Sequence, residues 1–137
     1  MKLFLAAFAL LFFLFPSYHF AQDSTKLIGT WELTSYKYTL PDTVITCTGA
    51  NFTSIKIITP QFFVYVGQTM PTKEFKRAGG GRYMVKGDML QELMMFSSIQ
   101  NMLGKTYKYK CAVNGDSWYH SGQINDIFIE EIWKRVE

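Results

Sequence analysis

The chain has 137 residues, which is enough for one domain with a single apolar core. Its formal net charge is only +3 at pH 7, and a nearly neutral domain is a poor candidate for binding nucleic acid. Aromatic residues make up 17% of the chain, which favours strands and apolar pockets.

The N-terminus has the pattern of a secretory signal peptide. Lys2 is a short positive region, residues 3–15 are apolar without a charge, and a small residue, Ala21, follows the break at Pro16. The apolar run is short for a membrane span. We therefore predict a signal peptide over residues 1–21, export to the periplasm or beyond, and a β-barrel domain over residues 22–137, for the reasons given below. An uncleaved N-terminal anchor is the alternative.

The mature chain is dominated by period-two alternation and turn signals, which predict strands. The first strand is predicted at residues 26–39, and a short extra strand at residues 43–47 lies in the loop that follows. Further strands are predicted at residues 53–59, 62–66, 82–86, 89–96, 106–113, 117–123 and 127–136. Residues 67–81 are predicted to be a long polar loop, because they contain Pro71 and end in three consecutive glycines.

Eight successive strands predict an antiparallel up-and-down barrel, because closure removes both edges of the sheet. Successive turns of such a barrel alternate between its two ends. The tight turns at Pro60, Gly87-Asp88 and Asn114-Gly115 fall at one end. The long connections fall at the other end, so we predict one closed end and one open end rimmed by loops.

The first and last strands both have an end at the closed side. Gly29 and Trp31 lie there on the first strand, and Trp133 and Arg135 lie there on the last. We predict that these four residues form the barrel floor, with Trp31 as the plug and the Arg135 guanidinium stacked on or beside an indole.

Gly29-x-Trp31, answered by an Arg on the last strand, resembles the lipocalin and calycin signature. A larger set resembles the short lipocalin-like domains of unknown function in secreted bacterial proteins. Its members are Ile55-Lys56, Thr59, Gly79-Gly80-Gly81 before Tyr83, Glu92, Gly104, Trp118-x-His120-x-Gly122 and Glu131-x-Trp133-x-Arg135. The resemblance implies an eight-stranded barrel with a small ligand and no established reaction. Leu90 departs from it, where a more polar or aromatic residue is expected.

Alternation assigns inward faces on three predicted strands. The inward sets are Tyr107, Tyr109, Cys111 and Val113; Tyr83 and Val85; and Trp118 and His120. On residues 89–96 and 127–136 the two faces are about equally apolar, so the directions of Glu92, Phe96 and Glu131 stay open.

We predict an exported binding protein that holds a small apolar or amphipathic molecule inside the barrel. The candidate ligand-binding residues are Lys56, Tyr83, Glu92, Phe96, Tyr107, Tyr109, Trp118, His120 and Glu131. No catalytic residue, metal or cofactor is predicted, and no nucleic-acid partner. Stable membrane insertion after cleavage is not predicted either, because Lys108 and Lys110 occupy the outer face of their strand.

Two alternatives stay open. The first applies if Glu92, His120 and Glu131 all face inward. Glu92 and His120 would then be an acid–base pair for a small barrel enzyme. The same three side chains could instead be metal ligands, or a polar network that only fixes the strand register. The second alternative is a periplasmic interaction or inhibitor module that acts through its loops. The basic residues Lys73, Lys76, Arg77 and Arg82 either attract an anionic head group or form a solvated loop.

The two cysteines, Cys47 and Cys111, are predicted at different heights of the barrel, in the mouth loop and near the closed end. A disulfide needs Cα atoms within about 7 Å, so the predicted meander argues against a bond between them.

Overall fold

The computed structural model describes residues 24–137, and this part of the chain is all-β, as predicted. The strands are β1 (Gly29–Thr39), β2 (Val44–Thr48), β3 (Phe52–Ile58), β4 (Phe62–Thr69), β5 (Phe75–Lys86), β6 (Met89–Ser97), β7 (Thr106–Asn114), β8 (Ser117–Ile124) and β9 (Ile127–Arg135). Two short 3₁₀ helices, η1 (Ser24–Leu27) and η2 (Gln100–Met102), complete the described elements. The predicted signal peptide lies outside the described residues.

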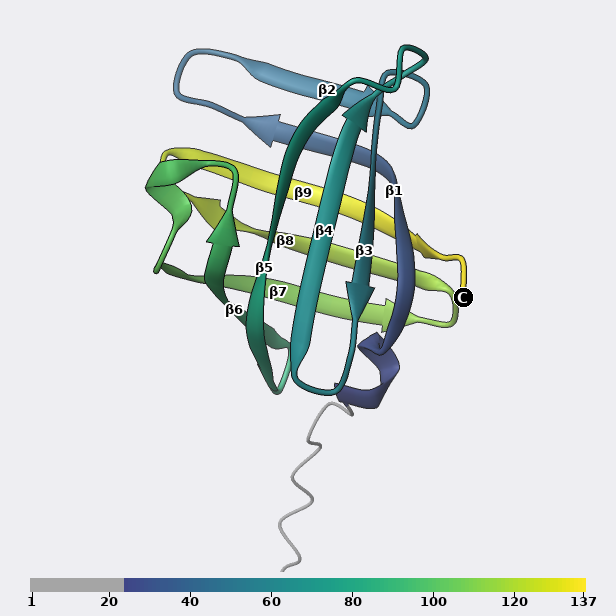
Figure 1. Cartoon of the computed structure of the whole chain (residues 1–137), viewed down its shortest axis with the longest axis vertical. Coiled ribbons are helices and arrows are strands. Elements are labelled where there is room, and N and C mark those ends of the chain that lie inside the picture. The colour runs from purple at the N-terminus through teal and green to yellow at the C-terminus, as the bar shows by residue number, and fades with distance from the viewer. Residues whose placement is uncertain (1–23) are drawn as a thin grey trace, which may run out of the picture.

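The strands form one antiparallel sheet that closes on itself. Its order is β2-β1-β3-β4-β5-β6-β7-β8-β9, and β1 also pairs with β9. Strand β2 is an addition to the barrel, since it pairs only with residues 35–39 of β1. In Figure 1, β3, β4 and β5 run down the front while β7, β8 and β9 cross behind them at a steep angle. The predicted eight-stranded up-and-down barrel is therefore confirmed, with β2 as a ninth strand.

The closed end is built on an aromatic plug. Trp31 is fully buried, and the Arg135 guanidinium lies over its ring at 4.2 Å from the centroid. The two Nη atoms of Arg135 donate hydrogen bonds to the backbone oxygens of Ile28 and Lys26 at 2.7 and 2.6 Å. Gly29 has a φ of +139°, and a Cβ there would lie 2.5 Å from Arg135 Nη1. Glycine is thus required for the arginine to reach the indole.

The prediction of a loop over residues 67–81 is wrong. Strand β4 continues to Thr69 and β5 begins at Phe75, so the three glycines lie inside a strand. A Cβ on Gly79 would lie 2.7 Å from Met94 Cε, and a Cβ on Gly81 would collide with the backbone oxygen of Leu93. The glycines therefore let β5 and β6 approach at a β-bulge, which falls between Gly80 and Gly81.

The same bulge overturns one predicted ligand contact, Phe96. Gly81 pairs with Met94 but Gly80 pairs with Phe96, so β6 holds one extra residue at this point. The extra residue reverses the inward alternation. Met94 is consequently buried at 1% exposure, whereas Phe96 is 67% exposed on the outside.

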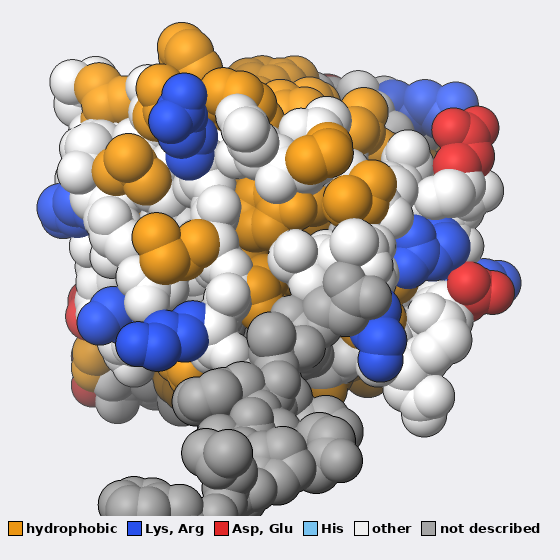
Figure 2. Space-filling view, turned by 90° about the horizontal axis from the view of Figure 1, so that it is seen from below, with side chains coloured by type: hydrophobic (Ala, Val, Ile, Leu, Met, Phe, Trp, Pro, Cys, Tyr) orange, Lys and Arg blue, Asp and Glu red, His pale blue; other side chains and the backbone are white. Residues whose placement is uncertain are grey.

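The outer surface of β3 and β4 is apolar. Its outward side chains, between 37% and 50% exposed, are Ile55, Ile57, Phe62, Val64 and Val66. Seen from below in Figure 2, hydrophobic side chains gather between scattered Lys and Arg side chains. Polar side chains of this barrel therefore lie mainly on other parts of its surface, and some of them lie inside it.

Cys47 and Cys111 do not form a disulfide with each other. Among residues 24–137, no helix is long and apolar enough to cross a membrane.

Candidate ligand-binding cavity

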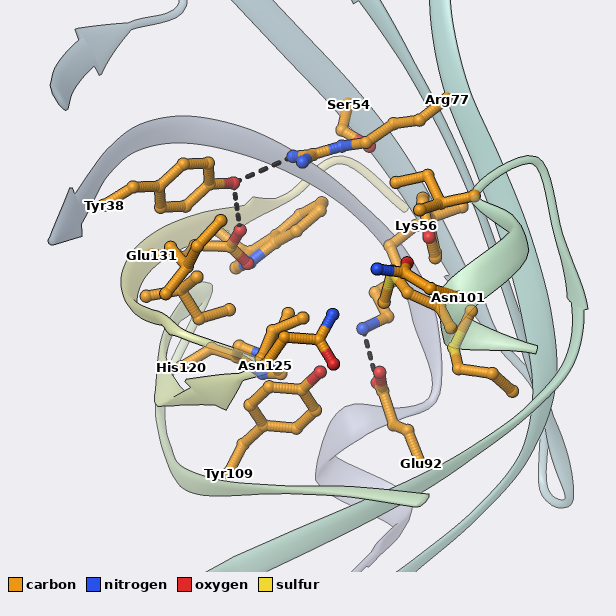
Figure 3. A pocket seen from close by; sticks show the side chains of 18 of the residues that line it. Tyr38, Ser54, Lys56, Arg77, Glu92, Asn101, Tyr109, His120, Asn125 and Glu131 are labelled. Atoms are coloured by element: carbon orange, nitrogen blue, oxygen red, sulfur yellow. Dashed lines mark hydrogen bonds and ion pairs between the residues drawn. The ribbon is translucent and has the colours of Figure 1, made fainter. Parts of the chain in front are cut away.

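A cavity of about 320 Å³ lies inside the barrel, towards the open end. Its apolar wall consists of Met94, Ile99, Met102, Ile124, Ile127 and Ile129. Helix η2 supplies Met102, which is 7% exposed, so the connection between β6 and β7 folds over part of the mouth. Polar side chains from β1, β3, β5, β6, β7, β8 and β9 face into the same space (Figure 3).

The first polar feature is a buried ion pair between Lys56 of β3 and Glu92 of β6. Their residues are 4% and 3% exposed, and their charged groups point toward one another across the cavity (Figure 3). Lys56 Nζ also lies over the rings of Phe63, Trp118 and Trp133, at 5.0, 5.2 and 5.8 Å from their centroids. Burial raises the pKa of Glu92, and the Lys56 ammonium opposes that rise.

The second polar feature is a hydrogen-bonded chain that ends on Glu131. Arg77 Nη2 donates to the Tyr38 hydroxyl at 2.8 Å, and that hydroxyl donates to Glu131 Oε1 at 2.6 Å (Figure 3). Trp133 Nε1 donates to Glu131 Oε2 at 3.0 Å. Both carboxylate oxygens are satisfied, which is what a carboxylate at 6% exposure requires.

The charge of this chain follows from its contacts. Burial opposes the Arg77 charge, but Tyr38 and Glu131 outweigh it and leave the pKa of Arg77 raised. Burial, followed by the charge of Glu131, raises the pKa of Tyr38. Tyr38 therefore stays a neutral donor between a cation and an anion.

His120 of β8 is the third polar feature. Its ring is 2% exposed and lies against Tyr109, with the ring centroids 4.1 Å apart. Burial, followed by the charge of Lys56, holds the pKa of His120 well below its ordinary value, so the imidazole is neutral. Among the described residues, Nδ1 of His120 has no hydrogen-bond partner. The buried imidazole therefore has unused hydrogen-bonding capacity in the wall of the cavity.

Glu92 and His120, considered as an acid–base pair from the sequence, do not form a hydrogen-bonded pair in the structure. The hydrogen bond of Glu92 goes to Lys56. Within residues 24–137, no group of three or more His, Cys, Asp and Glu side chains is arranged to hold a metal ion.

Five of the nine ligand-binding residues predicted from the sequence line the cavity. They are Lys56, Glu92, Tyr109, His120 and Glu131. All five come from strands whose inward residues alternate with exposed ones.

The other four lie elsewhere. Trp118 packs into the floor, 5.5 Å from Trp31 between ring centroids. The Tyr107 hydroxyl donates to Asn125 Oδ1 at 3.5 Å beside the mouth. The Tyr83 hydroxyl donates to a backbone oxygen in the β3–β4 turn at 2.8 Å, and Phe96 is outside.

Among the cavity residues that the sequence left unassigned are three large polar ones, Tyr38, Tyr65 and Arg77. Arg77 was grouped with the basic residues of a predicted loop, but β5 turns it inward while Lys73 and Arg82 are exposed. The sequence offered no signal for Arg77, because period-two alternation applies only to strands and its segment was predicted to be a loop.

Comparisons with protein-family models, with curated proteins and with solved structures found no match. The fold and the cavity define this protein as a closed β-barrel with a ligand-sized interior. Its function has to be inferred from the chemistry of that interior.

Proposed function

We propose that this protein is an exported, lipocalin-like binding protein that holds one small amphipathic molecule inside its barrel. The observation that carries the proposal is the cavity of about 320 Å³ near the open end. Its size lies at the lower end of ligand pockets, about 300 to 1,000 Å³. At about 30 Å³ per water-sized group it accommodates on the order of ten non-hydrogen atoms.

The lining of the cavity supports an amphipathic ligand. Isoleucine and methionine side chains form one wall, and the polar side chains offer unused hydrogen-bonding groups. Nδ1 of His120 has no hydrogen-bond partner among the described residues, and the phenol groups of Tyr65 and Tyr109 line the same space. Polar groups left without partners in a protein interior cost free energy, which a bound polar group recovers.

Native mass spectrometry of the protein purified from the exported fraction tests this function. We expect one small molecule per chain, released by organic extraction. N-terminal sequencing of the same sample tests the leader and should begin at Gln22. A protein of bare mass, with a cavity that also fails to retain added amphipathic molecules, would contradict the proposal.

A pair of variants on β9 provides the matched control. Ile129 lines the cavity and is 5% exposed, whereas Ile132 points outward and is 44% exposed. Ile129→Trp should fill the cavity and abolish ligand retention. Ile132→Trp adds the same side chain outside and should leave retention unchanged.

The enzyme alternative has less support, because it needs Glu92 and His120 to exchange a proton. Glu92 is hydrogen-bonded to Lys56 and His120 Nδ1 is not bonded to Glu92. The loop-mediated interaction module has less support because the barrel is not filled by its own side chains.

A further inference from the structure

We propose that Lys56 is a covalent capture site, whose amine condenses with the carbonyl group of a small aldehyde or ketone to form an imine inside the barrel. The inference rests on the proposed binding function, since the carbonyl compound must first enter the cavity. It adds a class of ligand and a reaction to that function.

The position of Lys56 sets it apart from the other lysines described. It lines the cavity at 4% exposure, whereas Lys108 and Lys110 on β7 face solvent. A ligand that fills the cavity is therefore held against this amine, and confinement of two reacting groups raises their effective concentration greatly.

Imine formation is balanced with the groups present. Lys56 gives one proton to Glu92, and the neutral amine attacks the carbonyl carbon, forming a C–N bond as the carbonyl oxygen takes up a proton from that nitrogen. The resulting hydroxyl takes the proton held by Glu92 and leaves as water as the C–O bond breaks, and the nitrogen keeps one proton and a positive charge. In sum, an ammonium and a carbonyl compound give an iminium and water, with no oxidant or reductant.

Glu92 suits both of its roles in this reaction. Burial raises its pKa, so accepting the Lys56 proton costs less than it would for an exposed carboxylate. After water has left, the iminium occupies the place of the ammonium, and the Glu92 carboxylate remains its counter-ion. The charge of the interior is the same before and after the reaction, which avoids an unpaired buried charge.

The surroundings of Lys56 also favour the product. Three aromatic rings lie 5.0 to 5.8 Å from Nζ, and aromatic faces stabilise a cation that has lost its water shell. Tyr109 and His120 line the same cavity and place polar side chains in its wall beside Lys56.

The test compares octanal with octanol, which has the same chain without the carbonyl group. Both are small enough for a cavity that holds on the order of ten non-hydrogen atoms. Octanol retention, measured by native mass spectrometry, reports binding alone. Octanal is trapped with borohydride, which reduces the imine to a stable amine, and the labelled lysine is found by peptide mapping.

We expect octanol to be retained and octanal to label Lys56 at least about tenfold more than Lys108 or Lys110. Octanol retention with octanal label only on the surface lysines overturns the capture site and leaves the binding function intact. Loss of both octanol retention and Lys56 labelling overturns the binding function together with this inference. Because the comparison uses the wild-type protein, it does not depend on the folding of a variant.

Two variants add to the test. Glu92→Gln keeps the amine but removes the group that protonates the departing hydroxyl, and should lower the labelling rate at Lys56 by about 10²-fold. Labelling at an unchanged rate would contradict the role given to Glu92. Lys56→Arg keeps the charge without a reactive amine, and should reduce total labelling to that of the surface lysines.

Discussion

Replacement of Lys56 by Met should destabilise the barrel in a way that depends on pH. The substitution keeps a similar chain length but leaves Glu92, 3% exposed, without its partner. A lone buried carboxylate escapes the cost of its charge by taking up a proton. Protonating a carboxyl of ordinary pKa 4.5 at pH 7 costs about 3.4 kcal/mol, from 1.36 kcal/mol per pH unit. The loss of stability at pH 7 is therefore about 3 kcal/mol, within the range for breaking a buried pair.

The sign of the pH dependence follows from the direction of the shift. Burial raises the folded-state pKa of Glu92, and loss of the Lys56 ammonium, which opposes that rise, raises it further. In the variant the contribution of this carboxyl to stability is therefore fully present below pH 4.5 and is lost as the pH rises through the folded-state pKa. The cost of Lys56→Met should accordingly shrink to less than about 1 kcal/mol at pH 5.

Urea unfolding followed by tryptophan fluorescence, at pH 5 and at pH 7, measures these differences. The matched control is the double variant Lys56→Met/Glu92→Leu, which removes both charges and should regain most of the stability at pH 7. Equal losses for Lys56→Met at the two pH values would refute the reasoning. So would a double variant no more stable than the single one at pH 7.

Three further outcomes are expected. Because buried His120 stays neutral, its contribution to wild-type stability is fully present above pH 6.5, and the free energy of unfolding falls by up to about 2 kcal/mol at pH 5. In His120→Gln the free energy of unfolding, measured by urea titration at pH 5 and at pH 7, should change less between the two pH values. Arg135→Met should lower the free energy of unfolding by about 2 to 3 kcal/mol through the loss of stacking and two hydrogen bonds, whereas exposed Lys134→Met should change it by less than about 0.5 kcal/mol in the same assay. Gly81→Ala should cost more than about 3 kcal/mol, because its Cβ would meet backbone atoms. Gly115→Ala should cost about 1 kcal/mol, because nothing lies within 4 Å of its Cβ. Similar melting temperatures for the two variants would contradict the packing given to β5.

The barrel was predictable because its signals are local. On β7, the buried residues Tyr107, Tyr109 and Cys111 alternate with exposed lysines, and a period of two is readable from a single strand. The hairpin Asn114-Gly115 was readable for the same reason, since Gly115 has the positive φ that its turn needs.

Strand β5 was not predictable from the same rules. A run of glycines is the ordinary sign of a loop, and only the close approach of β6 explains why glycine is needed at Gly81. That approach is a property of the closed sheet and leaves no trace in the residues around it.

Only some of the cavity-lining residues were predictable, for a related reason. Both faces of β6 carry large apolar residues, with Leu90 and Met94 buried and Leu93 and Met95 exposed. Composition could therefore not tell which way Glu92 points. Its direction is fixed by the pairing of β6 with β5 and β7, and so is the outward turn of Phe96.

The arrangement of charge inside the barrel bears on the kind of ligand that the proposed binding function requires. The ion pair of Lys56 with Glu92 is neutral as a unit, and so is the chain from Arg77 to Glu131. An anionic or cationic ligand would add a charge without a counter-charge to this buried set, at a cost in desolvation. A neutral ligand with one polar group would add none, and its polar group would meet the imidazole and phenol groups that line the cavity. The interior is thus suited to neutral amphipathic molecules, a class to which small aldehydes and ketones belong.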